Sequence, residues 1–270
     1  MANLKRGYTL NVIEQFFKPF LNYKYLLYQL IQREIKARYK QSIIGYAWVI
    51  VNPLMQLLVY SFVFSVVFRF PTSIPYPVFL FVGLLPWIYL QTVIANSTLA
   101  LVDNRELLKK VAFPREVFIY SIVTAKLIDL FFASLVFAAF MVFYQVPIST
   151  SSLLILPLLG IQMMLITGIG LLFSTANLFY RDIQYLANLI LMLWMYVSPV
   201  VYPLSMVPQE WVGLYKLNPM VGIIEGYRSA LFGAPFDTGA ILWSLGFSVV
   251  VFVLGFVTFK RMEKVFADLV

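Results

Sequence analysis

Few residues in this chain could do chemistry. The sequence has no His and no Cys, which excludes imidazole and thiolate metal sites, Cys nucleophiles and His-based triads, so no metal site is expected. Deep inside the apolar stretches the ionisable groups are Lys126 and Asp129. They are three residues apart on one helical face and can neutralise each other as an intramembrane ion pair. Charges inside a membrane are functional candidates, but this self-pairing favours a structural role.

The sequence also lacks the means to hydrolyse ATP. No Gly is followed by Lys, so the G-x-x-x-x-G-K-[ST] phosphate loop is absent. The acidic residues Glu210, Glu225 and Asp237 are too scattered to suggest a catalytic site. We therefore expect no catalytic residue and no cofactor in this chain; if ATP drives it, a separate ATPase chain holds the ATP and Mg²⁺.

The composition is that of an integral membrane protein. Of the 270 residues 61% are hydrophobic and 12% are charged, and the mean hydropathy is +0.86. A soluble domain carries about 25% charged residues, so this chain cannot coat a water-facing surface. The fold class expected is an all-α integral membrane protein with six transmembrane helices, because about 20 apolar residues cross a bilayer.

These six helices form a transmembrane domain over residues 43–259. The fifth predicted helix is short. The small residues of the fourth, including the Gly170/Ser174 pair, favour close helix packing. The expected spans are 43–68, 78–102, 117–144, 153–179, 185–202 and 239–259.

Residues 1–42 form the expected cytoplasmic N-terminal segment. From Tyr23 to Ile35 apolar residues recur at helical spacing, while Lys24, Arg33 and Lys36 fall mainly on other faces. This pattern favours an amphipathic helix lying in the membrane interface, directly before the first span. A solvated helix that packs on a soluble partner is the alternative.

Residues 203–238 are rich in proline yet fairly apolar, and too broken for two spans. Asn218 and Pro219 suit the N-cap and first position of a helix running to about Leu231. Glu225 and Arg228 lie three residues apart on it and could pair. We expect a re-entrant helical hairpin between spans 5 and 6; a plain surface loop is the alternative.

The most charged internal loop is 103–116. Asn104 or Asp103 could cap a short helix there, with Leu107, Leu108 and Val111 as its apolar face. A rigid helix between two spans could transmit force from a partner, although a plain interhelical turn would also fit. The candidate coupling residues are Asn104, Arg105, Glu106, Leu107, Leu108, Lys109, Lys110 and Val111.

The positive charges set the expected orientation. Six spans place both termini on one side, together with the loop at 103–116, the tight turn at Arg181 and Asp182, and the tail at 260–270. That side carries sixteen Lys and Arg residues against three on the other. The positive-inside rule therefore predicts that both termini are cytoplasmic.

Five stretches now carry a resemblance to a known family. They are REIKARYKQSIIGYAWVIVNP (33–53), NRELLKKVAFPREV (104–117), NLFYRDI (177–183), SPVVYP (198–203) and LNPMVGIIEGYR (217–228). In this order they resemble the membrane subunits of type-2 ABC exporters, in the branch that moves lipid-linked polysaccharides. The resemblance covers nearly the whole chain.

The resemblance implies a homodimer in the bacterial inner membrane, paired with two copies of an ABC ATPase subunit that touch the coupling helix. The implied substrate is an undecaprenyl-linked polysaccharide such as O-antigen. Membrane lipids are a further expected partner, and nucleic acid is not expected to bind. Teichoic acid and capsule exporters share the pattern. A small-molecule or drug ABC exporter, a membrane enzyme acting on polyprenyl-linked sugars and a stand-alone carrier are more distant alternatives.

A sugar substrate would favour an aromatic lining of the conduit. Pyranose rings present apolar faces that stack on aromatic rings. Trp48, Tyr60, Trp194 and Tyr196 in spans 1 and 5 are the candidate lining residues. Contact with lipid or with the bundle core is the alternative for each.

Overall fold

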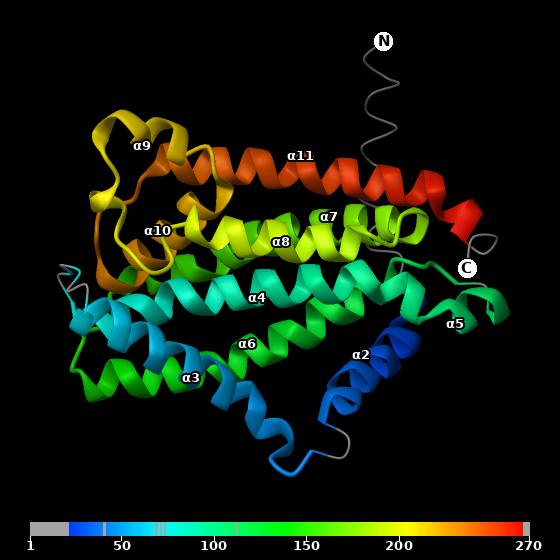
Figure 1. Cartoon of the computed structure of the whole chain (residues 1–270), viewed down its shortest axis with the longest axis horizontal. Helices are drawn as coiled ribbons and strands as arrows, with labels where there is room; N and C mark the ends of the chain where they lie inside the picture. The colour runs from blue at the N-terminus through cyan, green and yellow to red at the C-terminus, as the bar shows by residue number, and fades with distance from the viewer. Residues whose placement is uncertain are drawn as a thin grey trace.

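The computed structural model describes residues 22–39, 42–67, 70, 72, 74–111 and 113–266. This part of the chain is helical throughout, without a strand, as expected for an all-α protein. The predictions for residues 1–21 and 267–270 lie outside the described residues. The long helices run roughly along one axis and alternate in direction (Figure 1).

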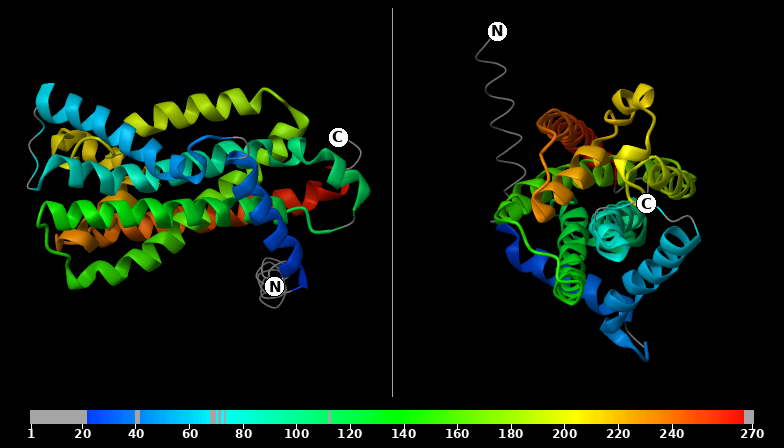
Figure 2. Two further views of the ribbon diagram at one scale, coloured as in Figure 1. Left: turned by 90° about the horizontal axis from the view of Figure 1, so that it is seen from below. Right: turned by 90° about the vertical axis from the view of Figure 1, so that its left-hand side faces the viewer.

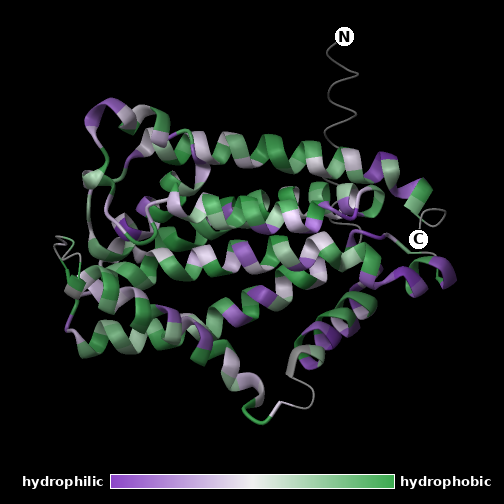
Figure 3. Ribbon diagram, in the orientation of Figure 1, coloured by the Kyte–Doolittle hydropathy of each residue, from purple (hydrophilic) through white to green (hydrophobic). Residues whose placement is uncertain are grey.

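Five helices in the described part are long and apolar enough to cross a membrane. Green, hydrophobic residues dominate them, and purple, hydrophilic residues gather toward the two ends of the bundle (Figure 3). With their flanking turns they cover Gly45–Ser65 (around α3, Trp48–Ser61), α4 at Tyr76–Asp103, α6 at Val117–Phe143, Thr150–Phe179 (around α7, Ile155–Phe179) and Thr238–Val265 (around α11, Thr238–Met262).

Small residues bring the central helices together. At Gly168 of α7, a Cβ atom would lie 2.6 Å from the Cα of Phe252 on α11, and a Cβ on Gly255 would meet the backbone of Gly168. At Gly170 a Cβ would lie 3.0 Å from the Cβ of Ser97 on α4. Glycine therefore allows α7 to pack closely on both neighbours.

The fifth predicted span is shorter than expected. Helix α8 covers Ile183–Tyr196, whereas the sequence predicts a span over 185–202. Its 14 residues rise about 21 Å, less than the hydrocarbon core of a bilayer. The helix ends because Pro199 disfavours the helical conformation for the residue before it. Residues 197–202 form turns instead.

Two helices of unlike environment follow. Helix α9, Gln209–Tyr215, is largely exposed, whereas α10, Pro219–Phe232, is almost fully buried. Asn218 is the N-cap of α10, and its side chain accepts a hydrogen bond from the amide of Met220, as the sequence predicts. The helix ends one residue beyond the predicted limit, at Phe232, and Gly233 follows as its C-cap with a φ of 71° that suits glycine.

The opposite end of the bundle, called here the α5 end, carries the short helix α5 (Arg105–Lys110) and the helix α2 (Lys24–Tyr39). Helix α2 runs obliquely to the bundle axis, and the last described residues lie at the same end (Figures 1 and 2). The side chains of Leu27 and Leu30 are buried, while Tyr25 and Tyr28 are exposed. One face of α2 thus packs on the bundle and the other faces outward.

Candidate functional site

Helix α5 presents a mainly charged surface. Arg105, Glu106, Lys109 and Lys110 are exposed, and Lys110 pairs with Glu106 at 3.0 Å. The predicted apolar face is only partly right, because Leu108 is buried in the bundle core. A short helix between two packed spans must anchor one side to the core, so few apolar groups remain for a partner.

Val111 follows α5 as an extended, half-exposed residue, and Leu107 is partly buried. These two side chains are the apolar groups that the segment leaves accessible beside its charged surface.

Asn104 does not cap α5 with its side chain, contrary to the prediction. It occupies the N-cap position, but its Oδ1 accepts a hydrogen bond of 2.6 Å from Nη2 of Arg33, and its Nδ2 donates to the carbonyl of Ala100 at 2.7 Å. The alternative cap, Asp103, is the last residue of α4. Asn104 therefore ties α2 to the junction of α4 and α5.

A charged cluster joins the start of α6 to the end of α11. Nζ of Lys260 lies 2.7 Å from the carboxylate of Glu116 and 3.0 Å from that of Glu263. The amide of Arg115 donates to Glu263 at 2.9 Å. Glu116 is 1% exposed; burial raises the pKa of its carboxyl group above 4.5, against the opposing pull of the Lys260 ammonium.

This cluster was not predicted from the sequence. There, Lys260 was used only in the count of positive charges on the predicted cytoplasmic side. The available signal was one acid and one base at the ends of two apolar spans expected on the same side. Arg181 and Asp182, by contrast, form the predicted turn between α7 and α8 and are exposed.

The four candidate conduit aromatics lie on α3 and α8, although not in equal environments. Trp48 and Tyr196 are exposed, whereas Tyr60 and Trp194 are partly buried. The indole of Trp194 packs edge-on against Trp87 of α4 at 6.0 Å and donates to Asn218.

Arg228 anchors α10 inside the bundle. Its guanidinium donates to Glu225 at 2.7 Å and to the carbonyl of Val200 at 3.1 Å, and its Cζ lies 3.7 Å from the ring centre of Phe79. The Glu225–Arg228 pair that the spacing allows is therefore present, and a buried cation needs such partners. It connects α10 to α4 and to the turn after α8.

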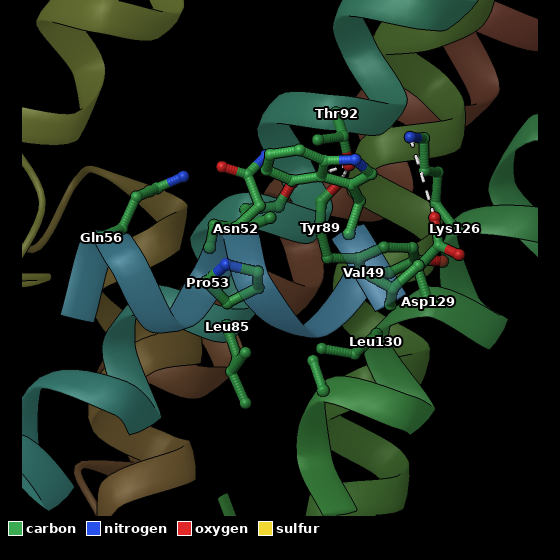
Figure 4. A pocket seen from close by; sticks show the side chains of 13 residues that line it. Val49, Asn52, Pro53, Gln56, Leu85, Tyr89, Thr92, Lys126, Asp129 and Leu130 are labelled. Atoms are coloured by element: carbon green, nitrogen blue, oxygen red, sulfur yellow. Dashed lines mark hydrogen bonds and ion pairs between the residues drawn. The ribbon is translucent and has the colours of Figure 1, made fainter. Parts of the chain in front are cut away.

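Lys126 and Asp129 form an ion pair at 3.8 Å, and the hydroxyl of Tyr46 donates to Asp129 at 3.2 Å. They lie beside a small pocket between α3, α4 and α6 (Figure 4). A search of the described ranges finds no group of three His, Cys, Asp or Glu residues that could hold a metal ion.

Comparison with known proteins gives two kinds of match. Residues 25–232 match the family model described as ABC-2 type transporter. The chain is 32% identical over 248 residues to the O-antigen export system permease protein RfbA of Klebsiella pneumoniae, covering 90% of this chain and 94% of that one. It is 35% identical over 220 residues to the RfbA permease of Myxococcus xanthus, covering 80% and 83%.

A more distant relative is the polysialic acid transport protein KpsM of Escherichia coli, 24% identical over 87% of this chain and 92% of that protein. The family model and the permeases agree with a helical chain that has, in its described part, five helices long and apolar enough to cross a membrane. The chain belongs to the ABC-2 type transporter family.

Proposed function

We propose that this chain is the membrane subunit of an ATP-driven exporter that moves O-antigen, as a lipid-linked polysaccharide, out across the bacterial inner membrane. The observation that carries the proposal is the similarity to two O-antigen export permeases over 80–90% of the chain. ATP and Mg²⁺ bind to a partner ATPase in this proposal, in keeping with the missing phosphate loop.

The proposed topology has six crossings, with α8 as the short fifth one, and both termini in the cytoplasm. The alternating helix directions and the many Lys and Arg residues at the α5 end support it. Helix α2 would then lie in the cytoplasmic interface. Helices α9 and α10 would form a re-entrant hairpin. Its non-helical connections need protein or water around them at membrane depth, and the burial of α10 within the bundle supplies protein neighbours there.

The proposed assembly is a homodimer with two ATPase subunits. The exposed charges of α5 and the accessible Leu107 and Val111 would receive the ATPase. Helices α3 and α8 have extensive exposed apolar faces, and in a dimer these would surround the conduit. Trp48, Tyr60, Trp194 and Tyr196 would line it and stack on sugar rings.

Capsule export is the second candidate, favoured by the similarity to the polysialic acid transport protein. The larger identity to the O-antigen permeases ranks it second. A teichoic acid exporter, a drug exporter, a polyprenyl-sugar enzyme and a stand-alone carrier have no such match among these relatives.

The test is deletion of the chain in its own bacterium, followed by staining of surface O-antigen and capsule and extraction of lipid-linked polymer from the cells. The proposal expects O-antigen to disappear from the surface and its lipid-linked form to accumulate inside. Loss of capsule alone would move the assignment to the second candidate. Unchanged surface polymers would contradict both. Restoring the tagged chain should also recover a co-purifying ATPase.

A further inference from the structure

The pocket beside the Lys126–Asp129 pair has several polar side chains within a mainly apolar lining, and the proposed coupling does not use them. Its volume is about 100 Å³, and it lies between α3, α4 and α6 and is partly open to the outside. Asn52 and Gln56 of α3 and Thr92 of α4 contribute polar side chains to it, with Thr92 across the pocket from Gln56 (Figure 4). Trp48, one helical turn before Asn52, completes the α3 side of the pocket and is 43% exposed.

This polar group lies well inside the transmembrane region. Lys126 is nine residues into α6 and Asp129 twelve, so at about 1.5 Å per residue they stand roughly 14 and 18 Å from the α5 end of that helix. Their side chains are only 11% and 18% exposed. Lys126 and Asp129 compensate each other's charge at this depth. Asn52 is exposed and Gln56 is half-buried, so an occupant of the pocket can reach both amides.

Two of its side chains have hydrogen-bonding capacity to spare. Across the described ranges no hydrogen bond joins the amide of Asn52 or Gln56 to another residue, whereas Thr92 donates to carbonyls of its own helix. Each amide offers both donors and an acceptor. An occupant that both donates and accepts hydrogen bonds would satisfy them.

The lining distinguishes among the parts of a lipid-linked sugar. A polyprenyl tail cannot satisfy the amides, and a phosphate would face the carboxylate of Asp129 as well as the ammonium of Lys126. Sugar hydroxyl and acetamido groups donate and accept, and the exposed ring of Trp48 can stack on a pyranose face. A volume of about 100 Å³ is below the roughly 150 Å³ of a cavity that takes benzene, so it suits a substituent of the sugar while the ring rests on Trp48.

We infer that the pocket formed by Asn52, Gln56, Thr92 and the Lys126–Asp129 pair binds a polar substituent of a sugar in the exported substrate. This inference rests on the proposed function and adds to it a sugar-binding subsite in the half of the membrane near α5. The ion pair then positions hydrogen-bonding groups in the pocket, besides neutralising its own charge.

The test uses the complete complex of the chain with its ATPase, in lipid nanodiscs. Two probes are compared by isothermal titration calorimetry: farnesyl diphosphate-linked N-acetylglucosamine, and farnesyl diphosphate alone. We expect the sugar-bearing probe to bind more tightly to the wild-type complex. Replacing Asn52→Leu and Gln56→Leu together should weaken it about tenfold, since two hydrogen bonds are lost. Binding of farnesyl diphosphate should not change.

Asn96→Leu is the matched control. It removes the same amide type from an exposed position of α4 outside the pocket, and binding of both probes should stay at the wild-type value. Ala133→Leu is the second variant. It fills the pocket from α6 without removing a polar group, and it should also weaken the sugar-bearing probe selectively.

Two results would overturn the inference: equal binding of the two probes to the wild-type complex, or a sugar preference that survives both the Asn52/Gln56 and the Ala133 variants. Neither result bears on the proposed export function, which the deletion experiment decides separately. Thermal melting and ATPase co-purification of each variant establish that the complexes tested are folded.

Discussion

Nε1 of Trp194 donates a hydrogen bond of 2.8 Å to Oδ1 of Asn218, the oxygen that also caps α10. Nδ2 of Asn218 donates to the carbonyl of Val197 and to Oγ of Ser198. One side chain thus connects the last turns of α8, the start of α10 and a candidate conduit aromatic. Any shift of Trp194 during transport would therefore disturb the cap at the N-terminus of α10.

The first prediction concerns this connection. Asn218→Ala removes the cap and leaves the indole of Trp194 without its acceptor, so the free energy of unfolding should fall by about 2 kcal/mol. Thermal melting of the purified chain in detergent measures it. Trp194→Phe removes one of these bonds and should cost less. Equal melting of Asn218→Ala and wild type would show that the connection does not stabilise the fold.

The second prediction concerns the cluster at Glu116. Lys260→Met leaves a buried carboxylate without its partner and should destabilise the chain by about 3 kcal/mol near neutral pH. Adding Glu116→Gln removes the orphaned charge and should restore part of the stability. Both effects are measured as melting temperatures of the purified chain.

The pH dependence of the Lys260→Met variant follows from the direction of the Glu116 shift. Burial raises the pKa of Glu116 above 4.5, so the folded state binds the proton more tightly than the unfolded state. Stability from this group is present below that value and is lost as the pH rises through the folded pKa. The deficit of Lys260→Met should therefore shrink as the pH falls toward 4.5. A deficit that grows on acidification would contradict this account.

Much of the fold could be predicted because hydropathy and helix signals are local. The apolar runs gave the long helices within a few residues, and Asn218–Pro219 gave the start of α10. The end of α8 was harder to predict, because its apolar run continues past the point where Pro199 ends the helix. Length of an apolar run and length of a helix are different quantities.

The candidate site was less predictable, since it depends on contacts between distant residues. Arg33 donates a hydrogen bond to the side chain of Asn104, one of the two candidate caps of α5, and no local pattern reveals that contact. Leu108 fits an exposed apolar face by spacing, yet packing buries it. The pocket likewise joins three helices; the sequence singled out Trp48 and the Lys126–Asp129 pair, but no local pattern places Asn52, Gln56 and Thr92 beside them.

The third prediction tests the close contact between α7 and α11. Gly168→Ala would place a methyl group against the backbone of Phe252, which cannot move as a flexible side chain could. The two helices must then separate, and stability should fall by about 2 kcal/mol, within the range for overpacked cores. Gly160→Ala on the same helix is the control, because no atom lies within 4 Å of its Cβ position. Equal melting of the two variants would mean that the contact is not tight.

The fourth prediction separates the two sides of α5. Lys109→Glu with Lys110→Glu reverses exposed charges that do not support the bundle core, so the chain should melt as wild type does. If α5 receives the ATPase, the same variant should lose co-purifying ATPase and surface polysaccharide at least tenfold. Leu108→Asp should instead destabilise the chain by several kcal/mol, because it buries a charge in the core.

Charge reversal on the turn between α7 and α8, by Arg181→Glu, provides the matched control for α5. Arg181 is exposed at the same end of the bundle. Its reversal tests whether the loss of any positive charge at that end is enough to release the ATPase. Loss of ATPase in the Lys109/Lys110 variant but not in Arg181→Glu would assign the contact to α5. Retention of the ATPase by both variants, with polymer still exported, would remove α5 from the coupling path.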